Sequence, residues 1–560
     1  MNRLTLGRIV FFVMLCLLLQ PVYAQDIIVT SNCSLADAIT AANSDKATGG
    51  CTAGSGADTI QLEGNITLDG ILPKIASQIT LEGKGHTISG AAHYRIFFVS
   101  SGTLTLNHVI LIDGVAGSGG AIYNDGALRI TNSHLYNNTA TRESGGAIYS
   151  SGTLHISESA FSDNAAASSG IGGTFGGAIY STAGELHITN SDFTRNRAAQ
   201  SGGAIDVDGG EVSVINCMFD SNSAAKFGGG AIDSDGSQIN ITGSAFKDNT
   251  AEFDGGAIRS NGTLNITDST FLDNSSAFAG GAIDHFGTLS IVGSSFIGNA
   301  AASFGGAVYG KSSQITISGS RFRGNTAVST GGAITVSSRG SAHAQLIIVN
   351  SVFDDNSVTG DDPRRDGSGG AIMNLGTSTE IIRSSFTDNS ATFVGGAIVN
   401  TDELIVSNST FSGNHAEFGG GGLFIVSDKS TTLTHLTLAH NSANEGGGIL
   451  VYADESEEAI LNLRNSLFDG SIGGDCVGML SQNVSNLIAD GSCTPAISGD
   501  PRLGRLLKPG QDRPPYHPLM GSSPAIDAAD PEYCIDSDQS GTPRPQGAAC
   551  DIGAFEYQPD

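Results

Sequence analysis

The sequence has few positively charged residues. Lys and Arg total 27 against 55 Asp and Glu, which gives a formal net charge of −28. A charge of this sign repels phosphate backbones and anionic lipid, so it excludes nucleic acid and acidic membranes as partners. Helix-forming runs of ten or more residues are also absent from the repeated part of the chain, which disfavours a helical fold.

Long apolar runs are absent beyond the N-terminus. Arg3 and Arg8 precede the apolar stretch "IVFFVMLCLLL", and "VYA" before Gln25 has the small residue of a cleavage site. This pattern predicts a signal peptide over residues 1–24. No later segment approaches ~20 continuous apolar residues, so no transmembrane segment is expected in the mature chain. We therefore expect a soluble protein that is secreted or exposed at the cell surface.

Cysteine is scarce, with eight in the chain. No CxxC pair or His/Cys spacing indicates zinc. Outside the signal peptide, six cysteines form near neighbours at the two ends of the chain, and export makes disulfides plausible there. The connectivity stays open at this point. The six are Cys33, Cys51, Cys476, Cys493, Cys534 and Cys550.

The sequence instead contains one motif that is repeated many times. The stretch "GGAIYSSGTLHISESAFSDNAA" covers residues 145–166, and most copies follow at steps of 25 to 27 residues. Such a period is typical of a repeat architecture. The first glycine of each copy stands at positions 119, 145, 176, 202, 229, 255, 280, 305, 331, 369 and 395, with degenerate copies at 420 and 446.

Each copy predicts three short strands punctuated by Gly, Asn, Ser and Asp. Three strands per repeat suit one coil of a parallel β-helix, in which coils stack at ~4.8 Å and equivalent residues form ladders. Phe, then Asn three residues later, recurs in ten coils, and Ser recurs two residues before each Phe. Cys217 takes one of these Ser places, which predicts a buried free thiol. A second Phe series before the glycine pairs is interpreted as core: Phe227, Phe253, Phe278, Phe304, Phe393 and Phe418.

These motifs resemble known families. The alternating "GGAI" and "FxxN" over about residues 119–471 is similar to the repeats of chlamydial polymorphic outer-membrane proteins, within the pectin-lyase-like right-handed β-helix superfamily. "CSLADAITAAN", residues 33–43, resembles the CSLREA cap, and its apolar spacing also predicts a short helix. The end, with "DIGAFE" at residues 551–556, is similar to the choice-of-anchor Q domain. No translocator barrel or sorting signal accompanies these motifs.

The expected fold is all-β: a single-stranded, right-handed parallel β-helix with an N-terminal cap and a small disulfide-linked C-terminal domain. The expected boundaries are a signal peptide at 1–24, a cap at 25–57, β-helix repeats at 58–490 and a choice-of-anchor Q-like region at 491–560. The chain is expected to be a monomer.

The candidate site comes from aligning the coils. The residue after "GGAI" runs Tyr, Tyr, Tyr, Asp, Asp, Arg, Asp, Tyr from position 123 to position 309. Residues i and i+2 of a strand share a face, so Asp206, Asp208, Asp233 and Asp235 should form a two-by-two carboxylate patch, with Arg259, Asp284 and His285 beside it. Calcium favours such oxygen clusters. The alternative is a solvated acidic face, and no cofactor is required by the sequence.

Two function classes remain open. The resemblance favours a non-catalytic adhesin or scaffold that binds an extracellular glycan or a host or matrix surface. The alternative is a polysaccharide lyase or hydrolase acting on acidic polysaccharide, which the superfamily also contains, although fold analogy alone is a weak warrant. The polygalacturonase-type carboxylate set is missing, so catalytic residues are unknown and an enzyme is the less favoured interpretation. Three longer connections, residues 165–175, 337–344 and 357–369, are expected to be solvated loops.

Overall fold

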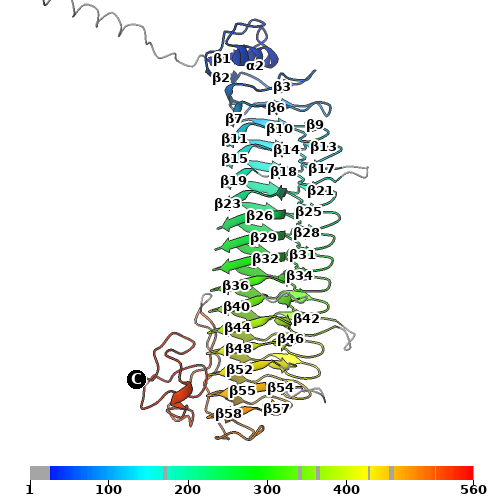
Figure 1. Cartoon of the computed structure of the whole chain (residues 1–560). Helices are drawn as coiled ribbons and strands as arrows, with labels where there is room; N and C mark the ends of the chain where they lie inside the picture. The colour runs from blue at the N-terminus through cyan, green and yellow to red at the C-terminus, as the bar shows by residue number, and fades with distance from the viewer. Residues whose placement is uncertain are drawn as a thin grey trace, which may run out of the picture.

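The computed structural model describes residues 26–558 except 168–172, 183, 339–343, 361–365, 427–428, 453–459 and 511–512. The predicted signal peptide and the centres of the three longer connections lie outside the described residues. The described chain forms one elongated stack of parallel coils (Figure 1).

One coil illustrates the repeat. β14 (Ile148–Ser150) and β15 (Thr153–Ser157) lie in the largest sheet, β16 (Ala160–Ser162) in a second and β17 (Ala165–Ala166) in a third. Each strand pairs in parallel with its counterpart in the next coil, as Phe161 does with Phe193. Alternate residues point inward and are buried, which confirms the predicted parallel β-helix.

The three sheets run along the rod. Within the described residues the first extends from β1 (Asp26–Val29) to β58 (Gln482–Val484) and has 30 strands. The second extends from β3 (Ile66–Thr67) to β59 (Leu487–Ile488), and the third from β9 (Val115–Ala116) to β50 (His415–Ala416). In three central coils the two strands of the first sheet merge into single long strands: β26 (Ile232–Thr242), β29 (Ile258–Thr267) and β32 (Ile283–Val292).

The interior is built from the predicted ladders. Phe rings from Phe161 to Phe411 stack face to face, with centroids 4.8 Å apart between Phe246 and Phe271, and are fully buried. In the Asn ladder, the backbone N–H and the Nδ2 of Asn249 both donate to Oδ1 of Asn274, at 3.1 and 2.9 Å. Nδ2 of Asn274 in turn donates to the Phe246 carbonyl. The side chain of Asn274 is thus hydrogen-bonded to both neighbouring coils.

The Ser ladder works in the same way, and Cys217 occupies its predicted place. The Ser244 hydroxyl accepts from the Cys217 N–H at 3.1 Å, and the Cys217 thiol donates to the Ile215 carbonyl. The thiol is buried and unpaired by any disulfide, and burial raises its pKa to about 11. This confirms the prediction of a buried free thiol.

The corner between the first and second sheets requires a left-handed backbone in every coil. Asn190, Asn350 and Asn408 have φ between 47° and 50°, and glycine fills the same place at Gly243, Gly293 and Gly319. Asn and Gly tolerate this conformation better than other residues.

The N-terminal end is closed by α2 (Leu35–Ser44), whose Ser34 side chain accepts from the Asp37 N–H. Its apolar residues are buried on the end of the stack, which confirms the predicted helix. Cys33 and Cys51 form a disulfide beside it, and the other pairs are Cys476–Cys493 and Cys534–Cys550.

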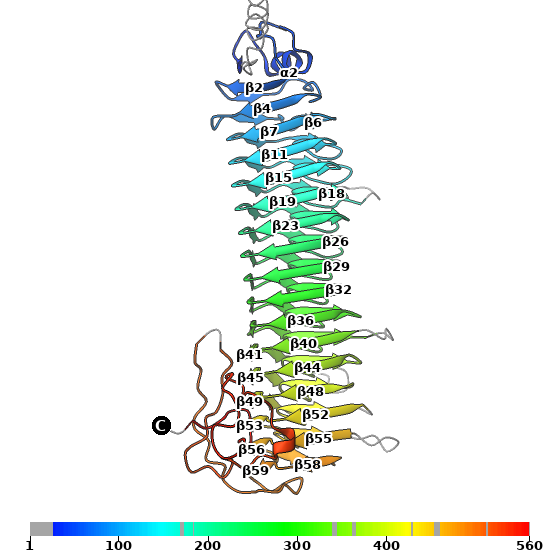
Figure 2. The ribbon, with the colours of Figure 1, turned by 60° about the vertical axis from the view of Figure 1, so that its left-hand side comes forward.

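The C-terminal region does not extend the stack but folds back along the second sheet (Figure 2). It has little regular structure apart from the short 3-10 helix η1 (Pro531–Tyr533). The Ser385 hydroxyl donates to the Pro515 carbonyl, and the Ala554 N–H donates to the Thr437 hydroxyl. Its own centre is an ion pair between Arg544 and Glu556, 3.2 Å apart, with both side chains 0% exposed.

Candidate functional site

The residues that follow each Gly-Gly-Ala-Ile or Gly-Gly-Ala-Val motif from Tyr123 to Tyr309, together with Phe98 in the coil before them, form one outward-facing row along the first sheet, which we call the axial row. Parallel register places each member beside the next, so the coil alignment made from the sequence is confirmed. Its members are Phe98, Tyr123, Tyr149, Tyr180, Asp206, Asp233, Arg259, Asp284 and Tyr309.

The first part of the axial row is aromatic. Ring centroids lie 5.1 Å apart between Phe98 and Tyr123, 4.7 Å between Tyr123 and Tyr149, and 5.5 Å between Tyr149 and Tyr180. The three tyrosines are half-buried. Among the described residues their phenolic hydroxyls have no hydrogen-bond partner, so a line of hydroxyl groups faces solvent at the spacing of the coils.

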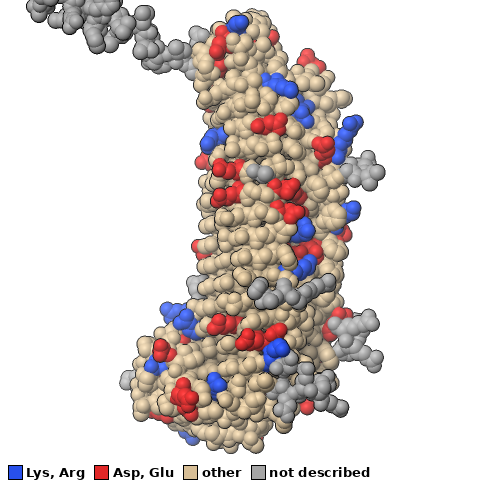
Figure 3. Space-filling view, viewed as in Figure 1, with Lys and Arg blue, Asp and Glu red and all other residues tan. Residues whose placement is uncertain are grey.

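The middle of the axial row is charged. Figure 3 shows acidic and basic side chains gathered about halfway along the rod, on a largely uncharged surface. Asp206 and Asp233 are neighbours in register. Oδ2 of Asp206 accepts from the Ser201 hydroxyl at 2.7 Å, and Arg259 donates to Asp233 at 3.1 Å. Burial raises the pKa of both carboxyls, and Asp233 adds to the effect at Asp206.

A second cluster joins Asp254, Asp284 and Lys311. The Lys311 ammonium lies 3.2 Å from a carboxylate oxygen of each aspartate. Burial raises the pKa of Asp284 to about 7, and the neighbouring Asp254 contributes. Burial also raises the pKa of Asp254. Two buried carboxyls beside a single ammonium retain a proton between them more readily than isolated ones.

Sequence reasoning missed Asp254 and Lys311. Asp254 stands immediately before a glycine pair, where neighbouring coils have Gly228, Ala279 and Phe304 in bridge register. Lys311 lies two residues beyond Tyr309. The available signal for Asp254 was its departure from the small or apolar residues at equivalent places. For Lys311 it was a positive charge two residues beyond the axial row, where earlier coils have Asp208 and Asp235.

The four predicted calcium ligands divide into a buried and an exposed pair. Asp208 faces Asp235 in register, as predicted, and both are exposed. Asp235 accepts a short hydrogen bond from Asn261, while Asp206 and Asp233 already bond to Ser201 and Arg259. Over the described ranges, no group of three or more His, Cys, Asp or Glu side chains is arranged to hold a metal ion.

His285 does not lie beside this patch. It follows Asp284 on the strand, so its side chain points to the interior, where it is 1% exposed. Burial lowers its pKa to about 4. Gly310 is its register partner in the next coil. The expectation that His285 joins the acidic patch is wrong because strand alternation separates the two.

The second Phe series is not core, which corrects the sequence interpretation. Phe227, Phe253 and Phe418 are 45%, 48% and 52% exposed. They lie in the loops that lead to the glycine pairs, outside the strands whose alternation defines the interior. Phe304 lies 5.6 Å from Tyr309, and Phe253 stacks on Phe278 at 4.9 Å. These rings therefore border the axial row.

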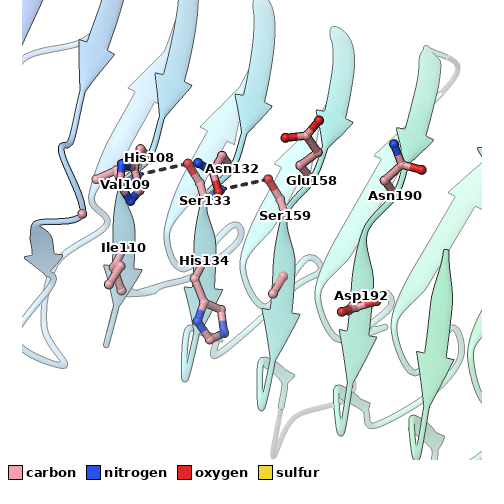
Figure 4. A pocket seen from close by; sticks show the side chains of 12 residues that line it. His108, Val109, Ile110, Asn132, Ser133, His134, Glu158, Ser159, Asn190 and Asp192 are labelled. Atoms are coloured by element: carbon pink, nitrogen blue, oxygen red, sulfur yellow. Dashed lines mark hydrogen bonds between the residues drawn. The ribbon is translucent and has the colours of Figure 1, made fainter. Parts of the chain in front are cut away.

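A separate open groove of about 590 Å³ lies on the sheet corner near the N-terminal end (Figure 4). His108, His134, Glu158 and Asp192 line it with Ser133 and Ser159. The Ser133 hydroxyl donates to the Thr131 carbonyl and accepts from the Val109 N–H. Its hydrogen-bonding capacity is used between coils, so the geometry does not support a Ser–His nucleophile.

A family model described as "Right handed beta helix region" matches residues 305–489. The chain forms a right-handed parallel β-helix. The crystal structure of pectate lyase Pel9A aligns over 90% of this chain and 88% of that chain, with 13% identity and a TM-score of 0.24. No curated protein matches the sequence.

Proposed function

We propose that this right-handed β-helix is a secreted or cell-surface scaffold that binds an elongated glycan without cleaving it. Three disulfides suit an oxidising compartment. No helix within the described residues is long and apolar enough to cross a membrane. The binding surface in this proposal is the axial row.

The observation that carries the proposal is the line of unpartnered hydroxyls on Tyr123, Tyr149 and Tyr180. The ring centroids lie 4.7 Å apart in the stacked pair Tyr123–Tyr149 and 5.5 Å apart in the tilted pair Tyr149–Tyr180. These ring contacts restrict the side chains, so less side-chain entropy remains to be lost on binding. A linear polyhydroxyl ligand laid along the axis can exchange hydrogen bonds with successive coils. A second outward row on the same sheet adds donors, since His155 stacks on His187 at 4.9 Å beside the exposed Arg129.

The charged part of the axial row favours binding over chemistry. Arg259 and Lys311 are each held by a buried carboxylate. A group that removes or donates a proton has to reach its substrate, whereas the Asp284 side chain is only 8% exposed.

The test is titration calorimetry of the secreted protein with glycans selected on an array. A triple variant, Tyr123→Phe, Tyr149→Phe and Tyr180→Phe, removes the hydroxyls and keeps the stacked rings. We expect it to weaken binding by about 2 kcal/mol or more, since each neutral hydrogen bond contributes ~0.5–1.5 kcal/mol. Tyr136→Phe, on the second sheet, is the matched control. Equal affinity in the triple variant would remove the axial row as the binding surface.

The alternative, a polysaccharide lyase or hydrolase, is favoured by one observation, the pKa of about 7 at Asp284. Such a value suits a general base near neutral pH. Incubation with oligogalacturonate should give no unsaturated or hydrolysed product. Product formation that is lost in Asp284→Asn would replace the scaffold proposal by the enzymatic one.

Calcium binding by the four predicted aspartates is a separate proposal. The exposed pair Asp208 and Asp235 would supply most of the ligand oxygens, because Asp206 and Asp233 are engaged. A flat strand face offers no loop to wrap the ion, so the affinity should be in the millimolar range of weak extracellular sites. Calorimetry should show heat of calcium binding that Asp208→Asn with Asp235→Asn abolishes. An equal response from wild type and variant would leave these residues as a solvated acidic face.

A further inference from the structure

A cleft of about 620 Å³ separates the C-terminal region from the corner of the coils that it folds back on. One wall consists of Gly319, Asn350 and Arg383, which occupy the sheet corner in three successive coils. The other wall comes from described residues of the C-terminal region, among them Pro509, Arg513 and Gln558. Clefts between separately folded parts of a chain are frequent ligand sites.

The cleft is cationic in a strongly acidic protein. Arg383 and Arg513 line it, and none of its described lining residues is acidic. The Nε of Arg383 is buried and has no hydrogen-bond partner. No ion pair within the described residues involves either guanidinium. A buried guanidinium donor without an acceptor is costly, and an incoming oxyanion would supply the missing acceptor.

The backbone conformation of Arg383 also indicates that this residue has a functional role. Its φ is 49°, at a corner where the two preceding coils have glycine and asparagine. Arginine has no intrinsic preference for the left-handed conformation, which is unfavourable for a residue with a long side chain. Strained residues of this kind cluster at functional sites.

An aromatic pair forms the remainder of the cleft. Tyr516 and Phe555 stack with centroids 4.3 Å apart and planes 6° apart. Gln539 fixes the back of the cleft, since its Nε2 donates to the Ser385 hydroxyl at 2.8 Å and to the Pro515 carbonyl at 2.9 Å. The cleft therefore combines two guanidinium groups with an apolar ring surface.

We propose that this cleft binds an acidic saccharide, with its oxyanion against Arg383 and Arg513 and its sugar ring against Tyr516 and Phe555. Guanidinium groups match the geometry of carboxylate and sulfate, and an aromatic pair suits the apolar face of a ring. The site lies on another face of the rod from the axial row and does not rest on the function proposed for that row.

The test is calorimetry of the full secreted chain with four probes: oligogalacturonate, a sulfated oligosaccharide, a neutral oligogalactoside and inorganic sulfate. We expect at least one acidic saccharide to bind, and the neutral one and inorganic sulfate to bind at least tenfold more weakly. Which of the two acidic probes binds more tightly identifies the oxyanion. Failure of both, or equal affinity for the neutral saccharide or for inorganic sulfate, would overturn the proposal.

Variants locate the site. Arg383→Gln and Arg513→Gln should each weaken binding about tenfold or more, since a charge-assisted hydrogen bond is lost. Arg383→Asn suits the corner backbone, so it keeps the fold and should weaken binding as much. Arg197→Gln, an exposed arginine on β21 (Arg197–Ala198) of the third sheet, should have no effect. Unchanged affinity in the Arg383→Gln, Arg513→Gln double variant would overturn the assignment.

Discussion

Two residues at the sheet corner differ from the residue types that usually occupy this left-handed position. Asn, Asp and Gly fill most left-handed corner positions, yet Glu158 and Arg383 adopt φ of 49° there. Their side chains line the two grooves described above. The left-handed backbone at this corner favours glycine or a short polar residue. The presence of a larger side chain there therefore needs a separate explanation.

Glu158→Asn should therefore stabilise the protein by about 0.5–1 kcal/mol, since Asn accepts the left-handed backbone more readily than Glu. Thermal melting measures the change. Glu211→Asn, at an exposed strand position, makes the same substitution without the left-handed backbone and should give no gain. A melting temperature unchanged or lowered by Glu158→Asn would show that the Glu158 side chain contributes more than its backbone costs.

At the scale of elements, the ladders bind one coil to the next. Asn274 is fully buried and accepts two hydrogen bonds from Asn249. Asn274→Ala leaves the two Asn249 donors without their acceptor and removes the side-chain bond to the Phe246 carbonyl, and we expect a loss of at least ~1–3 kcal/mol. Denaturant unfolding measures it.

Asn265→Ala is the matched control for this experiment. Asn265 is half-buried on the outer face of β29 and donates a single side-chain hydrogen bond to Asn240 at 2.9 Å. Loss of this hydrogen bond should lower the free energy of unfolding by less than Asn274→Ala does. Equal effects of the two substitutions would contradict the special role of the buried ladder.

The Asp254–Asp284–Lys311 cluster makes the stability of the central coils depend on pH. The pKa of Asp284 is raised from 3.8 to about 7, so the folded state holds its proton more tightly than the unfolded state. The stabilisation that protonated Asp284 contributes to the folded state is present at low pH and is lost as pH rises from about 4 to about 7. Asp284→Asn removes this dependence.

We expect the melting temperature of Asp284→Asn, relative to wild type, to be more favourable at pH 8 than at pH 4. Asp208→Asn, an exposed neighbour in the same face, is the control and should show no such trend. A difference that is independent of pH would mean that Asp284 is ionised throughout, held by Lys311.

The repeated part of the fold could be predicted from the sequence because each ladder position recurs in many coils. The Phe, Asn and Ser positions reveal the register, and the register places Asp206 beside Asp233. Exposure of Phe253 could not be read from the repeat, since it depends on where a loop ends and a strand begins. The inward direction of His285 follows from strand alternation after Asp284, so the sequence did contain that signal. Contacts such as Ser385 with Pro515 join segments that share no repeat, so the fold-back and its cleft were not predictable.

At the scale of the whole molecule, the C-terminal region depends on its own buried ion pair. Glu556→Gln leaves the Arg544 guanidinium charged and without a carboxylate partner in a site that is 0% exposed. Breaking such a pair typically costs ~3–5 kcal/mol. Because the repeat stack contacts mainly its nearest neighbours, we expect this loss to stay local.

Hydrogen exchange should then accelerate in residues 491–558 and in the strands that they cover, and stay unchanged in β26, β29 and β32. Glu532→Gln, an exposed residue of η1, is the control. Accelerated exchange along the entire rod would show that the C-terminal region stabilises the stack as a single cooperative unit.

The fold-back also decides how the rod would carry mechanical load. Gln558, at the end of the described chain, lines the same cleft as Gly319 and Asn350, so a pull on that end acts on the flank of the rod. Tension between this point and a ligand on the axial row would pass through the corner contacts near Ser385 and Asn408 and bypass the coils beyond them. The last coils would then carry no tension. The first contacts to break would be those of the folded-back segment.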